Sequence, residues 1–233
     1  MTLVKVCGIR DVAEGRAALA AGADWLGFVL WPESRRAIAA EAAAAIIQTL
    51  RAEQPAWSAV GVFVNPTPGE ARRAASLADL DYVQLSGDET AATVRQMPRP
   101  VVKAVHVRRG GEAEAAHLVR SDALGAAVYL LDTHAEGLYG GTGATFDWPA
   151  LRDVGQECLV AGGLRPDNVP AVLATLGPRG VDVSSGVEYR DGGKDPRLVR
   201  AFLDAVRTHD EIARSSRDAI ATSRTRGSED LRL

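Results

Sequence analysis

Short runs of apolar, often β-branched residues alternate along the chain with longer alanine-rich segments of helical character. The apolar runs show little alternation with polar residues, which is typical of parallel strands buried on both faces. We expect strands near residues 3–7, 25–30, 59–64, 82–85, 101–105, 128–131, 158–161 and 181–184. We expect helices near residues 11–21, 39–53, 68–77, 88–96, 112–120, 148–153, 167–176 and 196–207.

The order of these elements predicts one α/β domain, a (β/α)₈ barrel, over residues 1–208. Eight strand-then-helix units in about 208 residues lie at the short end of the range for this fold. The alternative is an open doubly wound sheet, whose first strand normally leads into a glycine-rich dinucleotide-binding turn. That turn here reads Cys7-Gly8-Ile9-Arg10, which does not match the fingerprint, so the closed barrel is favoured.

The pattern changes from about His209 onward. Residues 209–233 contain few apolar side chains and many Ser and Arg, so we expect a flexible C-terminal tail. Ile212, Ala213, Ile220 and Ala221 are enough only for a marginal helix.

Composition narrows the classes of function. Apolar residues make up 46% and charged residues 24% of the 233 residues, which is typical of a globular chain. A net charge of −3 argues against a broad nucleic-acid-binding surface but allows a local anion site. No apolar run reaches membrane-spanning length, and the N-terminus lacks a signal-peptide pattern. With only Cys7 and Cys158 there is no disulfide framework, which favours a reducing, cytoplasmic setting.

Barrel enzymes carry their active sites at the carboxyl ends of the strands, where the first predicted strand places Cys7. Strand alternation puts Lys5 on the same face as Cys7, and we expect that face to be the interior. An ammonium group there would favour the thiolate and lower the pKa of Cys7. The alternative for a lone cysteine is a small buried apolar residue, which is our interpretation of Cys158.

Asp132 ends the sixth predicted strand and precedes a glycine-rich segment at residues 133–147. This segment predicts a mobile lid that excludes water from the site below it. A carboxyl group under a closed lid can keep its proton near neutral pH and act as a general acid. The alternative is that Asp132 only caps the turn.

Two turns and one loop arginine predict anion contacts. Gly162-Gly163 follows the seventh strand and Ser184-Ser185-Gly186 follows the eighth, where barrels often hold phosphate on backbone N–H groups. Each turn alone is equally consistent with a simple connection. Arg36, in the loop after the second strand, is a candidate for gripping a substrate carboxylate with two hydrogen bonds.

The four histidines form no constellation, although His106 follows the fifth strand and could contact a substrate. No Cys/His spacing indicates zinc, and neither a Walker loop nor a GxSxG elbow is present. The sequence therefore predicts neither a metal nor a cofactor.

Several of these segments together resemble the phosphoribosylanthranilate isomerase family. They follow the family order from about residue 3 to residue 207, and as a set they are highly specific. The matching segments are VKVCGIRD (4–11), GADWLGFVLWPESRR (22–36), VGVFVN (60–65), VQLSGDE (83–89), VKAV (102–105), LLDT (130–133), YGGTGATFDW (139–148), AGGLRPDNV (161–169) and VDVSSGVE (181–188).

The resemblance implies a cofactor-free Amadori rearrangement in tryptophan biosynthesis. N-(5-phosphoribosyl)anthranilate would become 1-(2-carboxyphenylamino)-1-deoxyribulose 5-phosphate, with Cys7 as general base and Asp132 as general acid. Arg36 matches the arginine that contacts the anthranilate carboxylate, and the glycines after strands seven and eight match the phosphate grip. We expect a small phosphorylated substrate as the partner and a monomer or homodimer as the assembly.

Two positions depart from the family pattern, which usually has His where this chain has Ser86 and Lys where it has Ala144. The runner-up is a related barrel isomerase of histidine biosynthesis, or one serving both pathways, but that chemistry pairs two aspartates, and Cys7 argues against it. A non-catalytic phosphate-binding barrel is the other alternative, and it has no need for Cys7 and Asp132 together.

Overall fold

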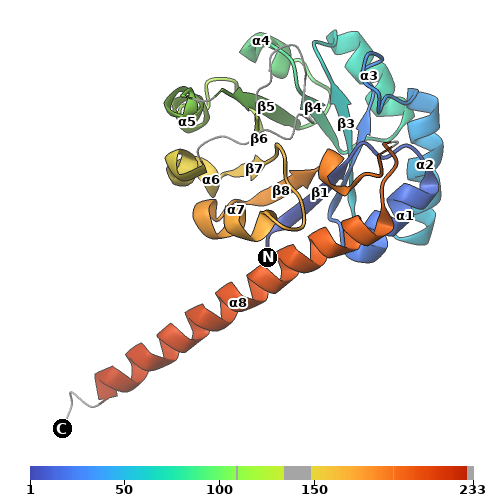
Figure 1. Cartoon of the computed structure of the whole chain (residues 1–233). Helices are drawn as coiled ribbons and strands as arrows, with labels where there is room; N and C mark the ends of the chain where they lie inside the picture. The colour runs from blue at the N-terminus through green and yellow to red at the C-terminus, as the bar shows by residue number, and fades with distance from the viewer. Residues whose placement is uncertain (109, 134–147, 191, 230–233) are drawn as a thin grey trace.

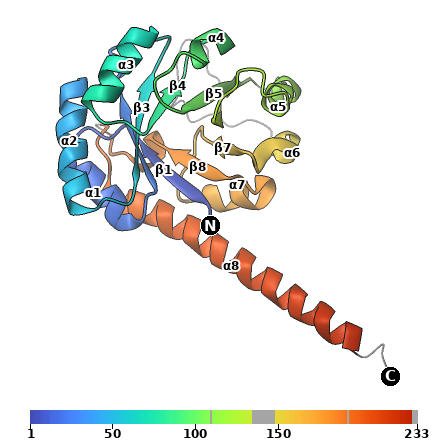
Figure 2. The same cartoon turned by 180° about the vertical axis from the view of Figure 1, so that it is seen from behind.

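The computed structural model describes residues 1–108, 110–133, 148–190 and 192–229, with side chains as far as Asp218 apart from those of Thr133, Trp148 and Arg217. Eight parallel strands close into a barrel in chain order, as Figure 1 and Figure 2 show from opposite sides. The predicted fold class is thus confirmed. The strands are β1 Leu3–Cys7, β2 Trp25–Val29, β3 Ser58–Phe63, β4 Tyr82–Leu85, β5 Val101–Val107, β6 Val128–Thr133, β7 Cys158–Val160 and β8 Gly180–Val183.

Helices connect the strands and cover the outside of the barrel (Figure 1). Their bounds agree with the prediction within a few residues, except in the fourth, sixth and last units. The α-helices are α1 Val12–Ala21, α2 Ala40–Glu53, α3 Pro68–Leu77, α4 Ala91–Val94, α5 Glu112–Arg120, α6 Arg152–Gly155, α7 Val169–Leu176 and α8 Pro196–Glu229. Two short 3₁₀ helices, η1 Trp148–Leu151 and η2 Ser185–Val187, precede α6 and follow β8.

Strand alternation divides the apolar side chains into two layers. Val4 and Val6 are fully buried in the large cluster between the barrel and its helices. The alternate positions of the strands face the interior instead, where Val60, Val102 and Leu130 belong to a separate cluster. The interior cluster fills the barrel, so that the space for a ligand lies above it, at the carboxyl ends of the strands.

The start of α3 shows how local hydrogen bonds determine where a helix begins. Thr67 accepts a hydrogen bond from the Glu70 backbone N–H, and the Glu70 carboxylate accepts one from the Thr67 backbone N–H. This reciprocal capping box, with Pro68 at the first helical position, satisfies backbone donors that would otherwise lack partners.

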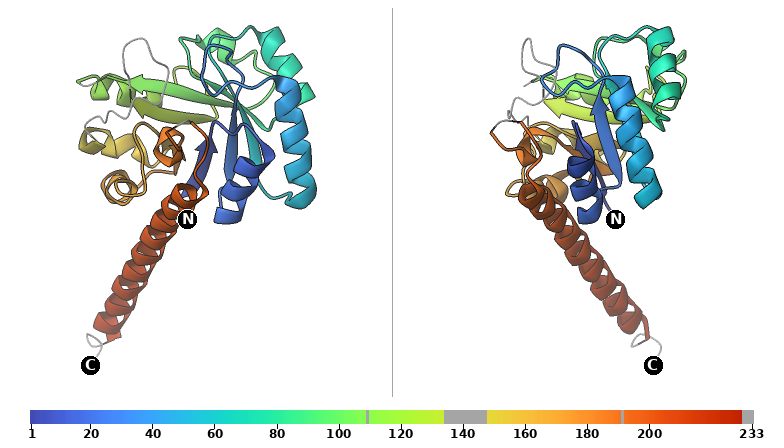
Figure 3. Two further views of the ribbon diagram at one scale, coloured as in Figure 1. Left: turned by 45° about the vertical axis from the view of Figure 1, so that its right-hand side comes forward. Right: turned by 90° about the vertical axis from the view of Figure 1, so that its right-hand side faces the viewer.

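The last helix is longer than predicted. Its first three turns bury Val199, Phe202, Leu203 and Val206, and the prediction ended the helix where these apolar residues end. The structure instead continues α8 to Glu229, projecting away from the barrel (Figure 3). Nine of the 22 added residues, 208–229, are the good helix formers Ala, Arg and Glu, and none is proline, so the helical backbone continues without an apolar face.

The boundary expected at residue 208 therefore lies inside α8. The backbone N–H and the hydroxyl of Thr2 each donate to the Asp210 carboxylate at 2.7 Å. Contact with the barrel thus reaches beyond residue 208. The flexibility expected for the remaining tail stays a prediction.

Within the described residues, no helix combines the length and the apolar character that crossing a membrane requires.

Candidate active site

A pocket opens at the carboxyl ends of the strands, and all eight residues that the sequence singled out line it. Five different strands or strand ends contribute them, so residues up to 179 positions apart in the chain share one cavity. They are Cys7, Arg36, Asp132, Gly162, Gly163, Ser184, Ser185 and Gly186.

Cys7 ends β1 and is buried at the base of the pocket. Lys5, two residues earlier, faces the interior as expected and forms an ion pair with Asp182 of β8 at 2.9 Å. Burial raises the pKa of the Cys7 thiol, although the Lys5 ammonium opposes this effect. The predicted lowering of the pKa was therefore wrong, because the loss of hydration outweighs the effect of the neighbouring cations Lys5 and Lys194.

Two buried acceptors near the pocket floor lack partners. Asp182 Oδ1 and Gln84 Oε1 are buried and receive no hydrogen bond from the described part of the chain. Both residues line the pocket. Burial raises the pKa of Asp182 against the opposing pull of Lys5. Buried polar atoms without partners are costly in a fold and are retained mostly where a ligand meets them.

Asp132 lies within β6 rather than after it, since the strand continues to Thr133. It is paired in register with His106 of β5, and both line the pocket. Apart from Thr133, the predicted lid at residues 133–147, which includes Ala144, lies outside the described residues.

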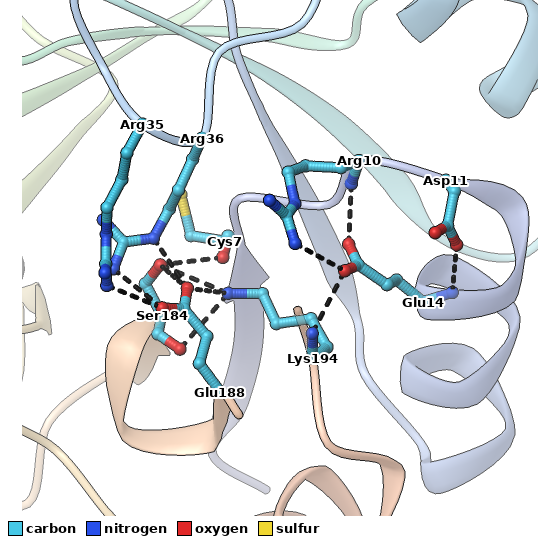
Figure 4. A network of polar contacts seen from close by, with 9 residues as sticks. All are labelled: Cys7, Arg10, Asp11, Glu14, Arg35, Arg36, Ser184, Glu188 and Lys194. Carbon is cyan, nitrogen blue, oxygen red and sulfur yellow. Dashed lines mark hydrogen bonds and ion pairs between the residues drawn. The ribbon is translucent and has the colours of Figure 1, made fainter. Parts of the chain in front are cut away.

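Arg36 reaches across the site to Glu188, as Figure 4 shows. Its Nε donates to Glu188 Oε1 at 2.6 Å and its Nη2 donates to Glu188 Oε2 at 3.0 Å. Its stem crosses Gly8, where an added Cβ would lie 2.6 Å from the Arg36 Cδ. Gly8 also has a φ of 83°, so both the backbone and the space require glycine here.

Glu188 is the centre of a group of charges that we call the Glu188 cluster: Glu188, Arg35, Arg36, Lys194 and Ser184 (Figure 4). Lys194 Nζ donates to Glu188 at 2.8 Å and Arg35 Nη2 donates at 2.9 Å. Burial of the carboxyl would raise its pKa, but the hydrogen bond from Arg36 and the charge of Lys194 lower the pKa of Glu188 to about 2. Glu188 is therefore ionised throughout the neutral range.

The same cluster extends to Cys7. Lys194 Nζ donates to the Ser184 carbonyl at 3.2 Å and lies 3.3 Å from its hydroxyl. The Ser184 hydroxyl donates to the Cys7 carbonyl at 3.0 Å. The ends of β1 and β8 are thus fixed to each other directly below the pocket.

The glycine-bearing turns have the geometry of an anion site. Gly162 and Gly163 have φ values of 90° and 63°, and a Cβ on Gly186 would lie 1.8 Å from the Leu164 carbonyl oxygen. The backbone N–H groups of Gly163, Ser185 and Gly186 donate to no other residue that the structure describes. They are available to a ligand, next to the three-residue helix η2.

Several pocket residues were not predicted. Val29, Trp31, Val62 and Val64 form an apolar wall, and Asp182 lies below it. Alternation along β3 and just beyond it could have indicated Val62 and Val64, but no sequence pattern indicates that Glu188 holds Arg36. Ser86, where the family usually has His, also lines the pocket, and its carbonyl contacts His106 Nε2 at 2.9 Å. Among the described residues, no group of three or more His, Cys, Asp and Glu is arranged to hold a metal ion.

The fold and the pocket define an enzyme class: a (β/α)₈ barrel with ionisable groups and glycine-bearing turns at the carboxyl face of the strands. The sequence matches the N-(5'-phosphoribosyl)anthranilate (PRA) isomerase family over residues 4–205. The chain belongs to this family of aldose–ketose isomerases.

Individual relatives agree. The chain is 42% identical to the N-(5'-phosphoribosyl)anthranilate isomerase of Pseudomonas fluorescens Pf-5, over 89% of this chain and 96% of that one. It is 39% identical to the enzyme of Dehalococcoides mccartyi, over 90% and 98% of the two chains. The crystal structure of the Thermotoga maritima isomerase superposes with a TM-score of 0.79 and 34% identity, covering 89% and 100%. A further isomerase structure, in complex with reduced 1-(o-carboxyphenylamino)-1-deoxyribulose 5-phosphate, has a TM-score of 0.76 and 32% identity over 89% and 100%.

Proposed function

We propose that this pocket converts N-(5-phosphoribosyl)anthranilate to 1-(2-carboxyphenylamino)-1-deoxyribulose 5-phosphate, in tryptophan biosynthesis. The main support is the joint placement of Cys7 and Asp132, on β1 and β6, in one pocket with Arg36 and both glycine-bearing turns. Strands β1 and β6 are three strands apart on the shorter way round the barrel, so groups on both can reach one sugar. Membership of the isomerase family supports the same substrate.

The reaction needs one acid and one base. Asp132 donates a proton to the furanose ring oxygen while the C1–O bond breaks, and the nitrogen lone pair forms the C1=N bond of a protonated Schiff base. The Cys7 thiolate then removes the proton from C2, and the electron pair moves to give a C1=C2 enolamine. Tautomerisation returns a proton to C1 and leaves the ketone at C2. Proton and electron counts balance without an added reactant.

The remaining pocket residues fit the ends of this substrate. Arg36 binds the anthranilate carboxylate, and the apolar wall of Val29, Trp31, Val62 and Val64 accommodates the aromatic ring. The free backbone N–H groups of Gly163, Ser185 and Gly186 bind the phosphate.

Substitution of the acid and the base tests the proposal. Cys7→Ser removes the readily ionised thiol and Asp132→Asn removes the acidic proton, and each should lower kcat by at least the 10²–10⁴-fold typical of general acid–base groups. The assay follows loss of phosphoribosylanthranilate fluorescence. Cys158→Ala is the matched control: burial raises the pKa of Cys158 to about 12, it lies at the start of β7 away from the pocket, and its loss should leave turnover unchanged. Near wild-type turnover of either site variant would refute the assigned role.

The compartment and the oligomeric state of the chain are also proposals. Cys7 and Cys158 are both unpaired thiols, which supports a reducing compartment such as the cytoplasm. We propose a monomer or homodimer, since the Thermotoga maritima relative is described as dimeric and also as monomers generated from it. Light scattering of the purified chain would decide between the two states.

A further inference from the structure

The Glu188 carboxylate occupies one particular edge of the Arg36 guanidinium. It accepts from Nε and Nη2, the side-on edge, at 2.6 and 3.0 Å. A guanidinium carries five N–H donors in a fixed plane, so three donors on Nη1 and Nη2 stay outside this pair. These form the end-on edge, which can bind a second carboxylate with two parallel hydrogen bonds. Glu188 therefore fixes the plane of Arg36 without using the edge needed for an anionic ligand.

The charge of the cluster suits such a ligand. Arg35, Arg36 and Lys194 carry three positive charges against the single negative charge of Glu188. The side chains of Glu188 and Lys194 are 2% and 1% exposed, so solvent screens their charges weakly, whereas Arg35 is 60% exposed and its charge is screened. Arg36, at 12% exposure, is the charged member of the cluster that also lines the pocket. The unbalanced charge is thus presented to the pocket through Arg36.

Glu188 is itself held rigidly. The segment after β8 folds back so that Glu188 and Lys194 form an antiparallel bridge. The backbone N–H of Lys194 donates to Glu14 Oε1 of α1 at 3.0 Å, and Glu14 is buried. Figure 4 shows this chain of contacts from α1 through Lys194 and Glu188 to Arg36. A charge held on a rigid support does not have to be ordered when the substrate binds.

We propose that Glu188, supported by Lys194, is a positioning residue that sets the orientation of Arg36 and so determines selectivity for a substrate bearing a carboxylate on its aromatic ring. This inference rests on the proposed function, because it assumes that Arg36 binds that carboxylate. Glu188 itself does not contact the substrate. Its effect is exerted only through the guanidinium.

The test compares two substrates. One is N-(5-phosphoribosyl)anthranilate and the other is its analogue made from aniline, which lacks the carboxylate. The ratio of their kcat/KM values measures carboxylate selectivity. Glu188→Gln keeps the size of the side chain and removes its charge, and should lower this ratio about tenfold through KM for the carboxylated substrate. A merely structural role would lower both kcat/KM values alike and leave the ratio unchanged.

A second background isolates the route through Arg36. In Arg36→Met the ratio should already be lost, and adding Glu188→Gln should change it no further. Glu188→Asp keeps the negative charge, so the charge balance of the cluster is preserved and the variant should fold. Its shorter side chain does not reach the Arg36 guanidinium in the same way, so it should still lose selectivity. Glu53→Gln, which removes the partner of an exposed ion pair with Arg16, is the control and should keep the ratio.

The outcomes separate the two proposals. If Arg36→Met keeps the ratio, then Arg36 does not bind the carboxylate, and both the recognition step and this inference fail. If Arg36→Met loses the ratio while Glu188→Gln and Glu188→Asp keep it, only the positioning role of Glu188 is overturned. A further loss of selectivity on adding Glu188→Gln to Arg36→Met would show that Glu188 acts by another route.

Discussion

Two buried lysines of the barrel wall make the same kind of ion pair with different consequences. Lys103 of β5 pairs with Glu89 at 2.9 Å and also donates to the carbonyl groups of Gly87 and Ala104 at 2.7 and 2.9 Å. Lys5 of β1 pairs with Asp182 at the same distance, but on the interior face of the barrel. The Glu89 oxygens are both hydrogen-bonded, whereas Asp182 Oδ1 has no partner within the described residues.

The difference separates structural from functional charge. The Lys103 pair lies between the barrel and the segment after β4, where it anchors the backbone at Gly87 and has every polar atom satisfied. The Lys5 pair lies below Cys7, where it opposes the rise in the thiol pKa and leaves an acceptor open at the pocket. Complete satisfaction is expected of a pair that only stabilises the fold. An incomplete one marks the place where a ligand and chemistry are to be accommodated.

The largest effects should come from breaking either pair. Lys5→Met and Lys103→Met each leave a buried carboxylate alone, which typically costs about 3–5 kcal/mol of unfolding free energy. Both losses should appear in denaturant titrations. Lys5→Met should also lower kcat, by at least tenfold, and Lys103→Met should not, because of these two ammonium groups only that of Lys5 favours the Cys7 thiolate.

Double substitutions sharpen this contrast. Lys103→Met with Glu89→Leu should recover much of the lost stability together with full activity, since an apolar pair can replace a buried ion pair. Lys5→Met with Asp182→Leu should recover stability without activity. Equal recovery of activity in both double variants would contradict the distinction.

Acid should remove stability through Glu188 in the next largest step. Its pKa is about 2 in the folded chain against an ordinary value of 4.5, so the folded state favours the ionised form. The resulting stabilisation, roughly 3 kcal/mol, is complete above pH 4.5 and is lost as the pH falls toward 2. Thermal melts of the wild type between pH 5 and pH 2 should fall more steeply than those of Glu188→Gln. Parallel curves would contradict the linkage.

The pH dependence of activity should show the raised pKa of Cys7. Since Cys7, the proposed base, acts as thiolate, kcat/KM should rise with pH from 7 to 9, up to tenfold per unit below the pKa. Removing the opposing Lys5 charge should move this rise to higher pH, by about one unit in Lys5→Met. A flat profile over the same range would show that Cys7 is already ionised.

The smallest effect is expected at the other end of the barrel, far from both pairs. A chain that stops after Ser216 should melt within a few degrees of the full chain and keep its activity, because α8 packs on the barrel mainly through Val199–Val206. A chain that stops after Thr208 should lose about 1–3 kcal/mol more, since it lacks the Asp210 carboxylate that binds Thr2. Asp210→Asn in the full chain is the matched comparison, and slow amide exchange beyond residue 216 would show instead that the tail is structural.

Most of the barrel could be predicted from the sequence, because strands buried on both faces are recognisable as continuous apolar runs. Alternation even placed Lys5 correctly beside Cys7, since a lysine under a helix would have been worse than one inside the barrel. The direction of the Cys7 pKa shift could not be predicted from the sequence, because it depends on how completely the folded chain removes water from the thiol.

Other features depend on contacts between distant segments. Glu188 is 152 residues from Arg36, and no local pattern indicates that they meet. The end of α8 was missed for a different reason. An apolar stripe shows where a helix packs, and it does not show where the helical backbone itself ends.

The pairs with Asp182, Glu89 and Glu188 together account for all of the chain's lysines. Lys5, Lys103 and Lys194 are only 0%, 4% and 4% exposed, whereas the N-terminal residue Met1 is 94% exposed. An amine-acylating reagent should therefore find these three side chains nearly inert in the folded protein. Each lysine becomes reactive only when the barrel wall around it opens. The labelling rate of each lysine, followed by mass spectrometry, would then measure how often the barrel opens at that place.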